Sequence, residues 1–396
     1  MSRLFILDPV CAQLLGHNLT SLVKFRSYFS SFSYYDSIIP VASRLLPEAF
    51  AQENEVEQAF HFYYHNRMKV SDAQGRAIVD ATAVLPDYEE RMLELATTDA
   101  REFFERFSIG AADSLFFPSV DFFSCLAIFE MLRTLPPERA PRLYLRFIGV
   151  MEYSCRLYPD PKRELLRQVK DIISRGYPVF LSAEASVYAD HLAELLDAPV
   201  AATPVPPFHD ILPMDDGEEF VVVSPGSGRI DKGFNLLPSI ISDFRRSYPR
   251  LKVRFLIQNL PPWDLEHNMK SASQIYAAPG VELLPSSISF EEMTAMFRRA
   301  HLVLMPYAAD IYELRSSAIL TESVGHGRQI ITSRGTGFEK EVSYFNLGLV
   351  CADVGGYVAA LAQFSQMSRR QLTNRANQAR HRYTTYCLSQ YKEWLK

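Results

Sequence analysis

Residues 224–233, SPGSGRIDKG, combine glycines and cations in a way that suits an anionic ligand. They directly follow the apolar run 220–223, which predicts a buried strand. Gly226 and Gly228 would let backbone N–H groups approach an anion closely, and Arg229 and Lys232 add positive charge. The segment fits neither GxxxxGK[ST] nor GxGxxG, so a tight turn with solvated cations is the alternative interpretation.

A second stretch, residues 302–337, predicts a strand, a loop, a helix and another strand. A helix that begins in this place directs its N-terminal N–H groups toward the carboxyl end of a parallel sheet, where open α/β folds bind ligands. An ordinary crossover with a solvated glutamate would show the same pattern. The candidate ligand groups of the loop and of the helix, which Ser316 or Ser317 would cap, are Tyr312, Glu313, Arg315, Ser316, Ser317 and Glu322.

Strand and helix patterns alternate along most of the chain, which predicts an α/β fold with parallel sheets. Strands are expected at 3–8, 37–41, 114–118, 144–150, 178–182, 200–202, 220–223, 251–257, 281–284, 302–306, 329–332 and 347–350. Helices are expected at 120–134, 161–174, 185–196, 235–248, 290–300, 358–364 and 371–396. Residues 44–109 read as mostly helical.

A proline-rich, acidic segment divides the sequence into two parts of similar size. Residues 204–219, PVPPFHDILPMDDGEE, predict a boundary there, because such composition is typical of linkers. We therefore expect a first Rossmann-like domain at 1–205, a linker at 206–219, a second Rossmann-like domain at 220–370, and a C-terminal helix at 371–396.

The composition excludes several classes of protein. The 396 residues are 48% hydrophobic and 22% charged, so the chain is not intrinsically disordered. A net charge of −5 argues against a dedicated nucleic-acid binder. The five cysteines show no CxxC spacing, which indicates neither a disulfide framework nor a zinc site and favours a reduced, cytoplasmic setting. The sequence shows no signal peptide and no apolar run long enough to span a membrane.

Taken together, the two stretches resemble the second domain of GT-B glycosyltransferases, in particular the retaining "group 1" class. The resemblance covers roughly residues 220–355 well, and in the first domain it covers only the order of elements. It implies two Rossmann-like domains that face each other across a cleft, with the C-terminal helix crossing back to the first domain. It also implies transfer of a sugar, such as a hexose, from a nucleotide diphosphate-sugar to an acceptor hydroxyl.

The resemblance assigns roles to the candidate residues of the second domain. Arg229 and Lys232 would bind the diphosphate, and Glu322 would bind the ribose hydroxyls. Ser316 and Ser317 would lie near the phosphate or the sugar, with Gly226 and Gly228 in the donor-binding loop. The family places a second glutamate eight positions before the first, where this chain has Leu314, so either Glu313 serves or Tyr312 and Arg315 contact the sugar.

On the acceptor side the resemblance points to Gly16 and His17, which take the place of the family's first glycine-containing loop. Many relatives carry a histidine after the strand at 144–150, where this chain has Glu152 nearby. The expected acceptor is a glycan or a lipid-linked glycan, with peripheral membrane contact by the first domain as an option. Polysaccharide biosynthesis is the process in which such an activity would belong.

No metal and no cofactor are expected, since the acidic pair Asp215 and Asp216 lies in the predicted linker and no DxD motif stands elsewhere in suitable context. Three rival functions remain open. They are a nucleotide-sugar epimerase, a non-catalytic relative that binds a nucleotide or a glycan, and an unrelated two-domain sugar-binding protein.

Overall fold

The computed structural model divides the chain into two compact units. It describes residues 2–12, 17–61, 69–71, 77–80, 88–149, 160–226, 228–260 and 279–396. Unit 1 comprises Met1–Glu184, Ala189–Thr203 and Tyr391–Lys396, and unit 2 comprises Ala185–Tyr188 and Pro204–Gln390. The long C-terminal helix α15 (Arg369–Trp394) therefore begins in unit 2, and its last residues belong to unit 1.

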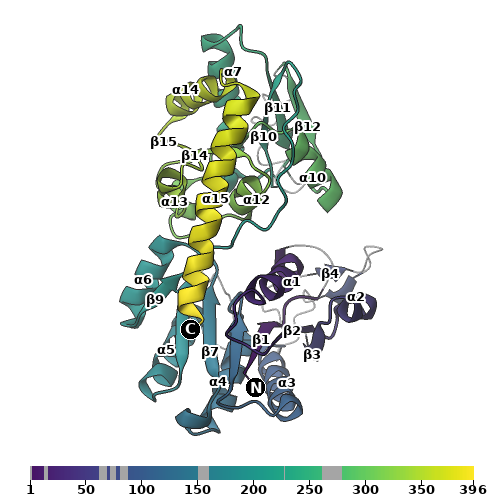
Figure 1. Ribbon diagram of the computed structural model, residues 1–396, viewed down its shortest axis with the longest axis vertical. Helices are drawn as coiled ribbons and strands as arrows, with labels where there is room; N and C mark the ends of the chain where they lie inside the picture. The colour runs from purple at the N-terminus through teal and green to yellow at the C-terminus, as the bar shows by residue number, and fades with distance from the viewer. Residues whose placement is uncertain are drawn as a thin grey trace. The chain divides into compact units, whose positions relative to one another are not determined.

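Unit 1 contains a seven-stranded sheet in the order β3-β2-β1-β6-β7-β8-β9 (Figure 1). Every neighbouring pair in this sheet is parallel. Its strands are β1 (Arg3–Asp8), β2 (Ser37–Ser43), β3 (Glu57–Phe60), β6 (Asp113–Phe117), β7 (Arg142–Phe147), β8 (Val179–Ala183) and β9 (Val200–Ala202). Its helices are α1 (His17–Phe29), α2 (Glu48–Glu53), α3 (Tyr88–Phe107), α4 (Phe122–Arg133), α5 (Pro161–Ser174) and α6 (Ser186–Leu196), with the 3-10 turn η1 (Pro137–Arg139).

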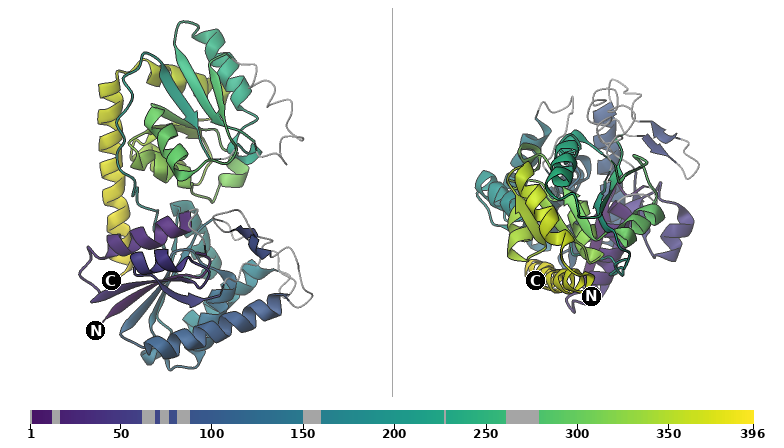
Figure 2. Two further views of the ribbon diagram at one scale, coloured as in Figure 1. Left: turned by 90° about the vertical axis from the view of Figure 1, so that its right-hand side faces the viewer. Right: turned by 90° about the horizontal axis from the view of Figure 1, so that it is seen from above.

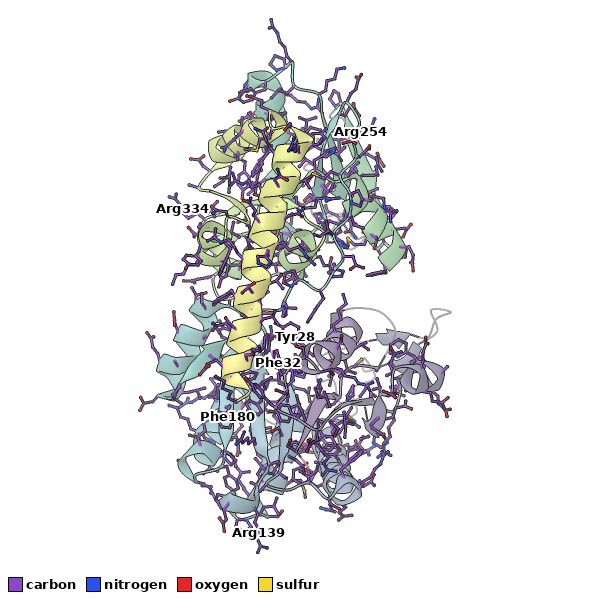
Figure 3. The ribbon with its side chains drawn as sticks, in the orientation of Figure 1. Tyr28, Phe32, Arg139, Phe180, Arg254 and Arg334 are labelled. Carbon is purple, nitrogen blue, oxygen red and sulfur yellow. The ribbon has the colours of Figure 1, made fainter. Side chains whose placement is uncertain are left out.

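Aromatic side chains fill the core of unit 1 and hold the end of α15. Phe25 of α1 has its ring centroid 5.4 Å from that of Phe116 on β6 and 5.4 Å from that of Tyr391 on α15. Trp394 packs edge-on at 5.2 Å from Tyr144 of β7. Tyr28 lies beside this end of α15 (Figure 3), 6.0 Å from Tyr391 between ring centroids. Burying rings of this size is a large apolar contribution to stability.

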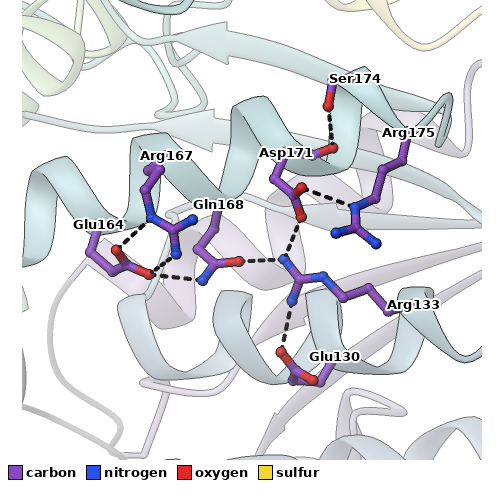
Figure 4. Close-up of polar contacts among 8 residues, drawn as sticks. All are labelled: Glu130, Arg133, Glu164, Arg167, Gln168, Asp171, Ser174 and Arg175. Carbon is purple, nitrogen blue, oxygen red and sulfur yellow. Dashed lines mark hydrogen bonds and ion pairs between the residues drawn. The ribbon is translucent and has the colours of Figure 1, made fainter.

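Polar side chains join α4 to α5 on the surface of unit 1 (Figure 4). Arg133 of α4 donates to Glu130 at 2.7 Å and to Asp171 of α5 at 2.9 Å, and it also contacts Gln168. Arg175 donates to Asp171 at 2.9 Å, and these two arginines lower the pKa of Asp171. Because exposed ion pairs contribute little, we attribute the packing of α5 to its buried apolar face rather than to this network.

The expectation that residues 44–109 are mostly helical is wrong in part. The structure places the parallel strand β3 there, and an antiparallel pair of β4 (Lys69–Ser71) and β5 (Ala77–Asp80). The strands were missed because β3 is a short edge strand that starts with the polar residues Glu57 and Gln58, so it lacks the apolar run of a central strand.

Unit 2 contains a six-stranded parallel sheet in the order β12-β11-β10-β13-β14-β15. Its strands are β10 (Phe220–Ser224), β11 (Val253–Gln258), β12 (Val281–Leu284), β13 (Leu302–Met305), β14 (Gln329–Ser333) and β15 (Gly348–Cys351). Its helices besides α15 are α7 (Leu237–Ser247), α10 (Phe290–Arg299), α11 (Ala309–Tyr312), α12 (Ala318–Gly325), α13 (Glu339–Tyr344) and α14 (Val354–Ser365), with the 3-10 turn η2 (Ile230–Lys232). The sequence did not predict α11 and α13, which are four and six residues long.

Both faces of the second sheet are buried, as the continuous apolar strands predict. Alternate residues of β10 enter two separate cores, with Phe220 and Val222 in one and Val221 and Val223 in the other. Helices α7 and α14 contribute to the first core, and α10, α12 and α13 contribute to the second (Figure 2). The α/β fold class with two parallel sheets is therefore confirmed.

The segment 204–219 belongs to unit 2 and is held there by two buried hydrogen-bonding side chains, Arg328 and His301. Arg328, 2% exposed, donates to the carbonyl oxygens of Leu212 at 2.8 Å and Pro213 at 3.1 Å. His301 accepts from the N–H of Val221 through Nδ1, so its Nε2–H donates to the carbonyl of Asp215 at 2.7 Å. Burial lowers the pKa of His301 to about 4, and the ring is therefore neutral near pH 7.

Among the described residues, no helix is both long enough and apolar enough to cross a lipid bilayer. The described cysteines, Cys11, Cys125, Cys351 and Cys387, are free thiols and buried.

Candidate functional site

The two sequence motifs meet at the carboxyl edge of the sheet of unit 2. Strand β10 lies between β11 and β13, and the chain order of the strands reverses there. The loop after β10 carries residues 225–233, and the loop after β13 leads to α11 and α12. Ligands of open α/β sheets bind at this kind of switch point. The fold therefore presents both motifs at the position where a ligand is expected.

Two glycines give the first loop its path. Gly226 has φ 91°, and a Cβ on it would lie 2.8 Å from Lys232 Nζ and 2.9 Å from Ile319 of α12. Gly233 has φ 78°, and a Cβ there would overlap the Pro306 carbonyl oxygen at 1.8 Å. Larger residues at either position would thus push the loop away from α12 and β13. The buried Gln258, at the end of β11, accepts from the N–H of Gly226 at 2.7 Å and fixes the loop from its other side.

Lys232 points its ammonium group back into the first loop. Nζ donates to the carbonyl oxygen of Gly226, and Glu322 of α12 is close enough to favour the charged form. Burial, with a smaller effect of Arg229, lowers the pKa of Lys232 to about 8. The amine is therefore mainly protonated at pH 7, and an anion in the loop would stabilise that charge further.

Arg229 contacts Asp231 of its own loop and Tyr312 of the connection between β13 and α12, which we call the second loop. Its Nη2 donates to Asp231 Oδ2 at 2.8 Å and to the Tyr312 hydroxyl at 3.1 Å. Tyr312 is 5% exposed, and burial raises its pKa, so the hydroxyl remains protonated and Asp231 Oδ2 lies 3.4 Å from it as an acceptor. This arrangement orients one face of the guanidinium and leaves the exposed part of Arg229 for a ligand.

Backbone contacts hold the first and second loops together. The N–H of Ala308 donates to the Asp231 carbonyl oxygen at 2.9 Å. Gly337 donates to the Tyr312 carbonyl at 2.6 Å, so the loop after β14 supports the same region. The cations of one motif and the helix start of the other are therefore parts of one constructed site, which sequence spacing alone could only suggest.

Helix α12 begins where the sequence predicts, but its expected side-chain cap is not formed. Ser317 occupies the N-cap position with φ −144° and ψ 125°, and its side chain makes no capping hydrogen bond. Its hydroxyl instead donates to the Tyr307 hydroxyl at 3.4 Å, because Tyr307 lies beneath the loop with its ring 4.5 Å from that of Tyr312. The partly exposed Ser316 precedes it directly.

The remaining predicted donor-side residues surround this site. Glu322 is partly buried on α12, near Lys232. Arg315 places its guanidinium 5.9 Å from the Tyr312 ring, and Glu313, exposed, follows α11. Gly228 donates its N–H to the Asn259 carbonyl at 2.9 Å, so it serves the shape of the loop.

The acceptor-side candidates are not placed by the structure. Gly16 and Glu152 lie outside the described residues, and His17 starts α1 but its side chain is not described. Across the described ranges, we find no group of three or more histidine, cysteine, aspartate or glutamate side chains that could hold a metal ion.

Comparison with known proteins identifies the fold of the chain. The sequence matches no protein-family model and none of the curated proteins. Solved structures match over nearly the whole chain. A sucrose-phosphate synthase from Thermosynechococcus elongatus has 11% identity and a TM-score of 0.60, covering 99% of this chain and 98% of its own. The chain has the GT-B fold.

Two further structures support the GT-B fold. A UDP-forming α,α-trehalose-phosphate synthase from Burkholderia xenovorans matches with 11% identity and a TM-score of 0.60, covering 99% of this chain and 97% of its own. A glycosyltransferase from Rickettsia africae matches with 10% identity and a TM-score of 0.62, covering 100% and 98%. At such low identity the likeness establishes the fold, and activity must be argued from the site.

Two residues of the GT-B site were missed at the sequence level. Asp231 lies between the two cations of the first motif, and its acidic side chain gave no sign that it would hold Arg229 against Tyr312. Gln258 was included in no motif, although a polar residue directly after the apolar residues 255–257 of a predicted strand is a usable signal. A polar side chain buried at a strand end needs a partner, and here that partner is the N–H of Gly226 in the first loop.

We expect Tyr312→Phe to reduce sugar transfer while nucleoside-diphosphate affinity changes by no more than a few fold. The substitution removes one hydroxyl contact of Arg229, and Asp231 still holds the guanidinium at 2.8 Å. Steady-state rates and calorimetric affinities on the same preparation test this. Arg315→Ala should behave in the same way, and full activity in both variants would exclude these residues from the sugar end of the site.

Proposed function

We propose that the protein is a glycosyltransferase that moves a sugar from a nucleotide diphosphate-sugar to an acceptor hydroxyl. The observation that carries this proposal is the convergence of Arg229, Lys232 and the start of α12 at the switch point of unit 2. The GT-B fold supports it, because the structural neighbours carry the names of sugar-phosphate synthases and of a glycosyltransferase.

The diphosphate of the donor would bind between the first loop and α12. Arg229 presents an exposed guanidinium, and Lys232 presents an ammonium that donates to the carbonyl oxygen of Gly226. Charge-assisted hydrogen bonds from such groups are stronger than neutral ones. The first N–H groups of α12 add the positive end of the helix dipole.

In the transfer step, the bond between the anomeric carbon and the diphosphate oxygen breaks, and a bond from the acceptor oxygen to that carbon forms. The nucleoside diphosphate leaves with the electron pair, and the proton of the acceptor hydroxyl passes to an oxygen of the departing diphosphate. Arg229 and Lys232 would stabilise the negative charge that develops on the leaving group, without a metal. We infer retention of configuration from the group 1 resemblance, and one structural neighbour, a trehalose-6-phosphate synthase, is described as transferring a glycosyl group with retention.

Glu322 is proposed to accept hydrogen bonds from the two ribose hydroxyls of the donor. We expect Glu322→Gln to weaken donor binding by about 1–3 kcal/mol, since a neutral amide oxygen is a poorer acceptor than a carboxylate. The melting temperature should change little. Calorimetry at pH 6.5 is the suitable measurement, because Lys232, whose pKa is about 8, stays protonated there.

If Glu322 were instead a structural partner of a nearby cation, Glu322→Gln would melt earlier and still bind nucleotide normally once folded. Arg328 is engaged with backbone carbonyls of Phe297, Leu212 and Pro213, whereas Lys232 lies near Glu322, so Lys232 is the cation that this alternative would involve.

The proposed reaction is tested by the release of nucleoside diphosphate from a panel of nucleotide sugars, with and without acceptors. UDP-glucose with sugar phosphates comes first, because two structural neighbours are a sucrose-phosphate synthase and a UDP-forming trehalose-phosphate synthase. Glycans and lipid-linked glycans complete the acceptor panel. Acceptor-dependent release of diphosphate supports the transferase, and conversion of the donor sugar with no release would indicate an epimerase. Tight donor binding without turnover against every acceptor would indicate a non-catalytic binding protein.

A further inference from the structure

Unit 2 contains a pocket that none of the proposed donor-site residues lines. It has a volume of about 690 Å³. Its lining residues come from α13, from Phe345 directly after α13, from residues 381–389 of α15, and from Ser186. All of these belong to unit 2, including Ser186, which lies in the segment Ala185–Tyr188. Helices α13 and α15 lie side by side (Figure 1), and Arg382 of α15 donates to the carbonyl oxygen of Tyr344 at 3.3 Å. A pocket of this volume suits a small molecule rather than a protein surface.

The rim of the pocket is positively charged. Lys340, His381 and Arg382 are exposed and line it, and Glu341 is the single acidic residue among the described lining residues. Glu341 is only 6% exposed, and burial raises its pKa. Its carboxyl therefore neutralises less of the positive charge of Lys340 and Arg382. An anion would therefore be attracted to this rim.

Inside the pocket, the carboxyl of Glu341 is only half satisfied. Its Oε1 accepts from the Ser186 hydroxyl at 3.0 Å, and its Oε2 has no hydrogen-bond partner among the described residues. Leaving a buried polar atom without a partner costs free energy, so native structures rarely keep one without a reason. This oxygen is shielded from solvent, so a ligand hydroxyl would supply the missing hydrogen bond after a rotation of the Glu341 carboxyl toward the pocket.

Aromatic rings form the apolar wall of the pocket. Phe345 lies 4.8 Å from Tyr344, with the rings nearly perpendicular at 83°, and 4.8 Å from Tyr386. Tyr344 is 72% exposed, although a large aromatic side chain gains most from being covered. The ligand should therefore have an apolar face as well as its charge and hydroxyl groups.

We propose that this pocket is a second binding site of unit 2, for a small anion that carries hydroxyl groups, such as a sugar phosphate or a sugar acid. The anionic group pairs with Lys340 and Arg382, a hydroxyl group meets Glu341, and the ring lies against Tyr344. The site is independent of the proposed donor site, and its occupancy requires no transfer reaction.

Isothermal titration calorimetry of the full chain tests the proposal with four probes: glucose 6-phosphate, glucuronate, glucose and inorganic phosphate. We expect glucose 6-phosphate or glucuronate to bind more tightly than glucose or inorganic phosphate. Lys340→Ala should weaken that binding by roughly tenfold, because it removes a charge-assisted contact. Lys340→Ala and Arg382→Ala together should abolish it. Lys340 is exposed, so its variant should fold even if Arg382→Ala disturbs the end of α13.

Two control variants separate this site from others. Arg370→Ala removes an exposed arginine from the same helix outside the pocket, and it should bind the probe as the parent does. Arg229→Ala alters the donor site and should also leave this binding unchanged. Binding that survives in the Lys340 and Arg382 variants would overturn the proposal, because the probe would then occupy another site. Absence of binding by all four probes, or equal binding of inorganic phosphate and the sugar anions, would overturn it as well.

Discussion

Replacing the cations of the first loop, in Arg229→Ala and Lys232→Ala, should each weaken nucleoside-diphosphate binding at least tenfold. A charge-assisted hydrogen bond to phosphate contributes roughly 1.5–3 kcal/mol, and each 1.4 kcal/mol is about a factor of ten in affinity. Lys232 should show the larger loss, because it is mostly buried and its ammonium has no acidic hydrogen-bond partner in the described loop. Calorimetric titration with UDP, the nucleotide in a neighbour's name, measures the effect.

The control for this experiment is uridine, which lacks the diphosphate. Its affinity should be the same in the parent and in both variants, since neither cation is expected to contact the nucleoside. Arg334→Ala is the matched control variant, because Arg334 is exposed after β14 (Figure 3) and lies outside both loops. If uridine affinity fell as far as UDP affinity, the loop would be structural and the assignment of Arg229 and Lys232 would be wrong.

The second large effect concerns stability, and it arises in unit 1. Asp8 ends β1, is 2% exposed, and has an Oδ1 without a hydrogen-bond partner among the described residues. Burial, together with the nearby charge of Asp121, raises the pKa of Asp8 to about 7. In the unfolded chain its pKa is the ordinary aspartate value of 3.8, so the folded state binds the proton more tightly. The stability associated with that proton is fully present below pH 4 and is lost as the pH rises through about 7.

We therefore expect Asp8→Asn to melt higher than the parent at pH 8, with the difference shrinking as the pH falls toward 5. A shift from 3.8 to about 7 corresponds to on the order of 4 kcal/mol of pH-dependent stability, since each pKa unit is worth about 1.4 kcal/mol. The amide keeps an oxygen for the backbone N–H groups that Asp8 accepts from, and it cannot ionise. Melting temperatures at several pH values between 5.5 and 8.5 provide the measurement.

Asp190→Asn is the control, because Asp190 is exposed on α6. This variant should keep the pH dependence of the parent. A melting-temperature difference for Asp8→Asn that is the same at every pH would show that Asp8 does not bind a proton in this range. A loss of stability at pH 8 would mean that the charged form is the one the fold requires.

Much of the fold was predictable because its strands are apolar runs separated by clear helix patterns. Strand β1 and helix α5 occupy the residues that the sequence indicates, the latter with Asp160 as its cap and Pro161 at its first position. The alternation also predicts the parallel sheets. The edge strand β3 and the four-residue helix α11 were not predictable, because elements this short are stabilised by tertiary contacts rather than by local pattern.

The candidate site was predictable to the level of its two motifs but not to the level of its contacts. The residue types and spacing of Gly226, Arg229 and Lys232 predict an anion-binding site. The role of Asp231 depends on where the second loop brings Tyr312, and no local rule contains that information. The same holds for Ser317, which occupies the predicted cap position while its hydroxyl is directed to Tyr307.

The central claim, that unit 2 binds a nucleotide diphosphate-sugar between the first loop and α12, is tested most directly by a thermal-shift screen across nucleoside diphosphates and nucleotide sugars. A ligand at one hundred times its Kd stabilises the folded state by about 2.7 kcal/mol, so the correct donor should stand out. We expect one nucleotide sugar and its nucleoside diphosphate to raise the melting temperature of the parent and to have no effect on the Arg229→Ala, Lys232→Ala double variant. An equal rise in the parent and in the double variant, or no rise with any nucleotide at millimolar concentration, would contradict the claim.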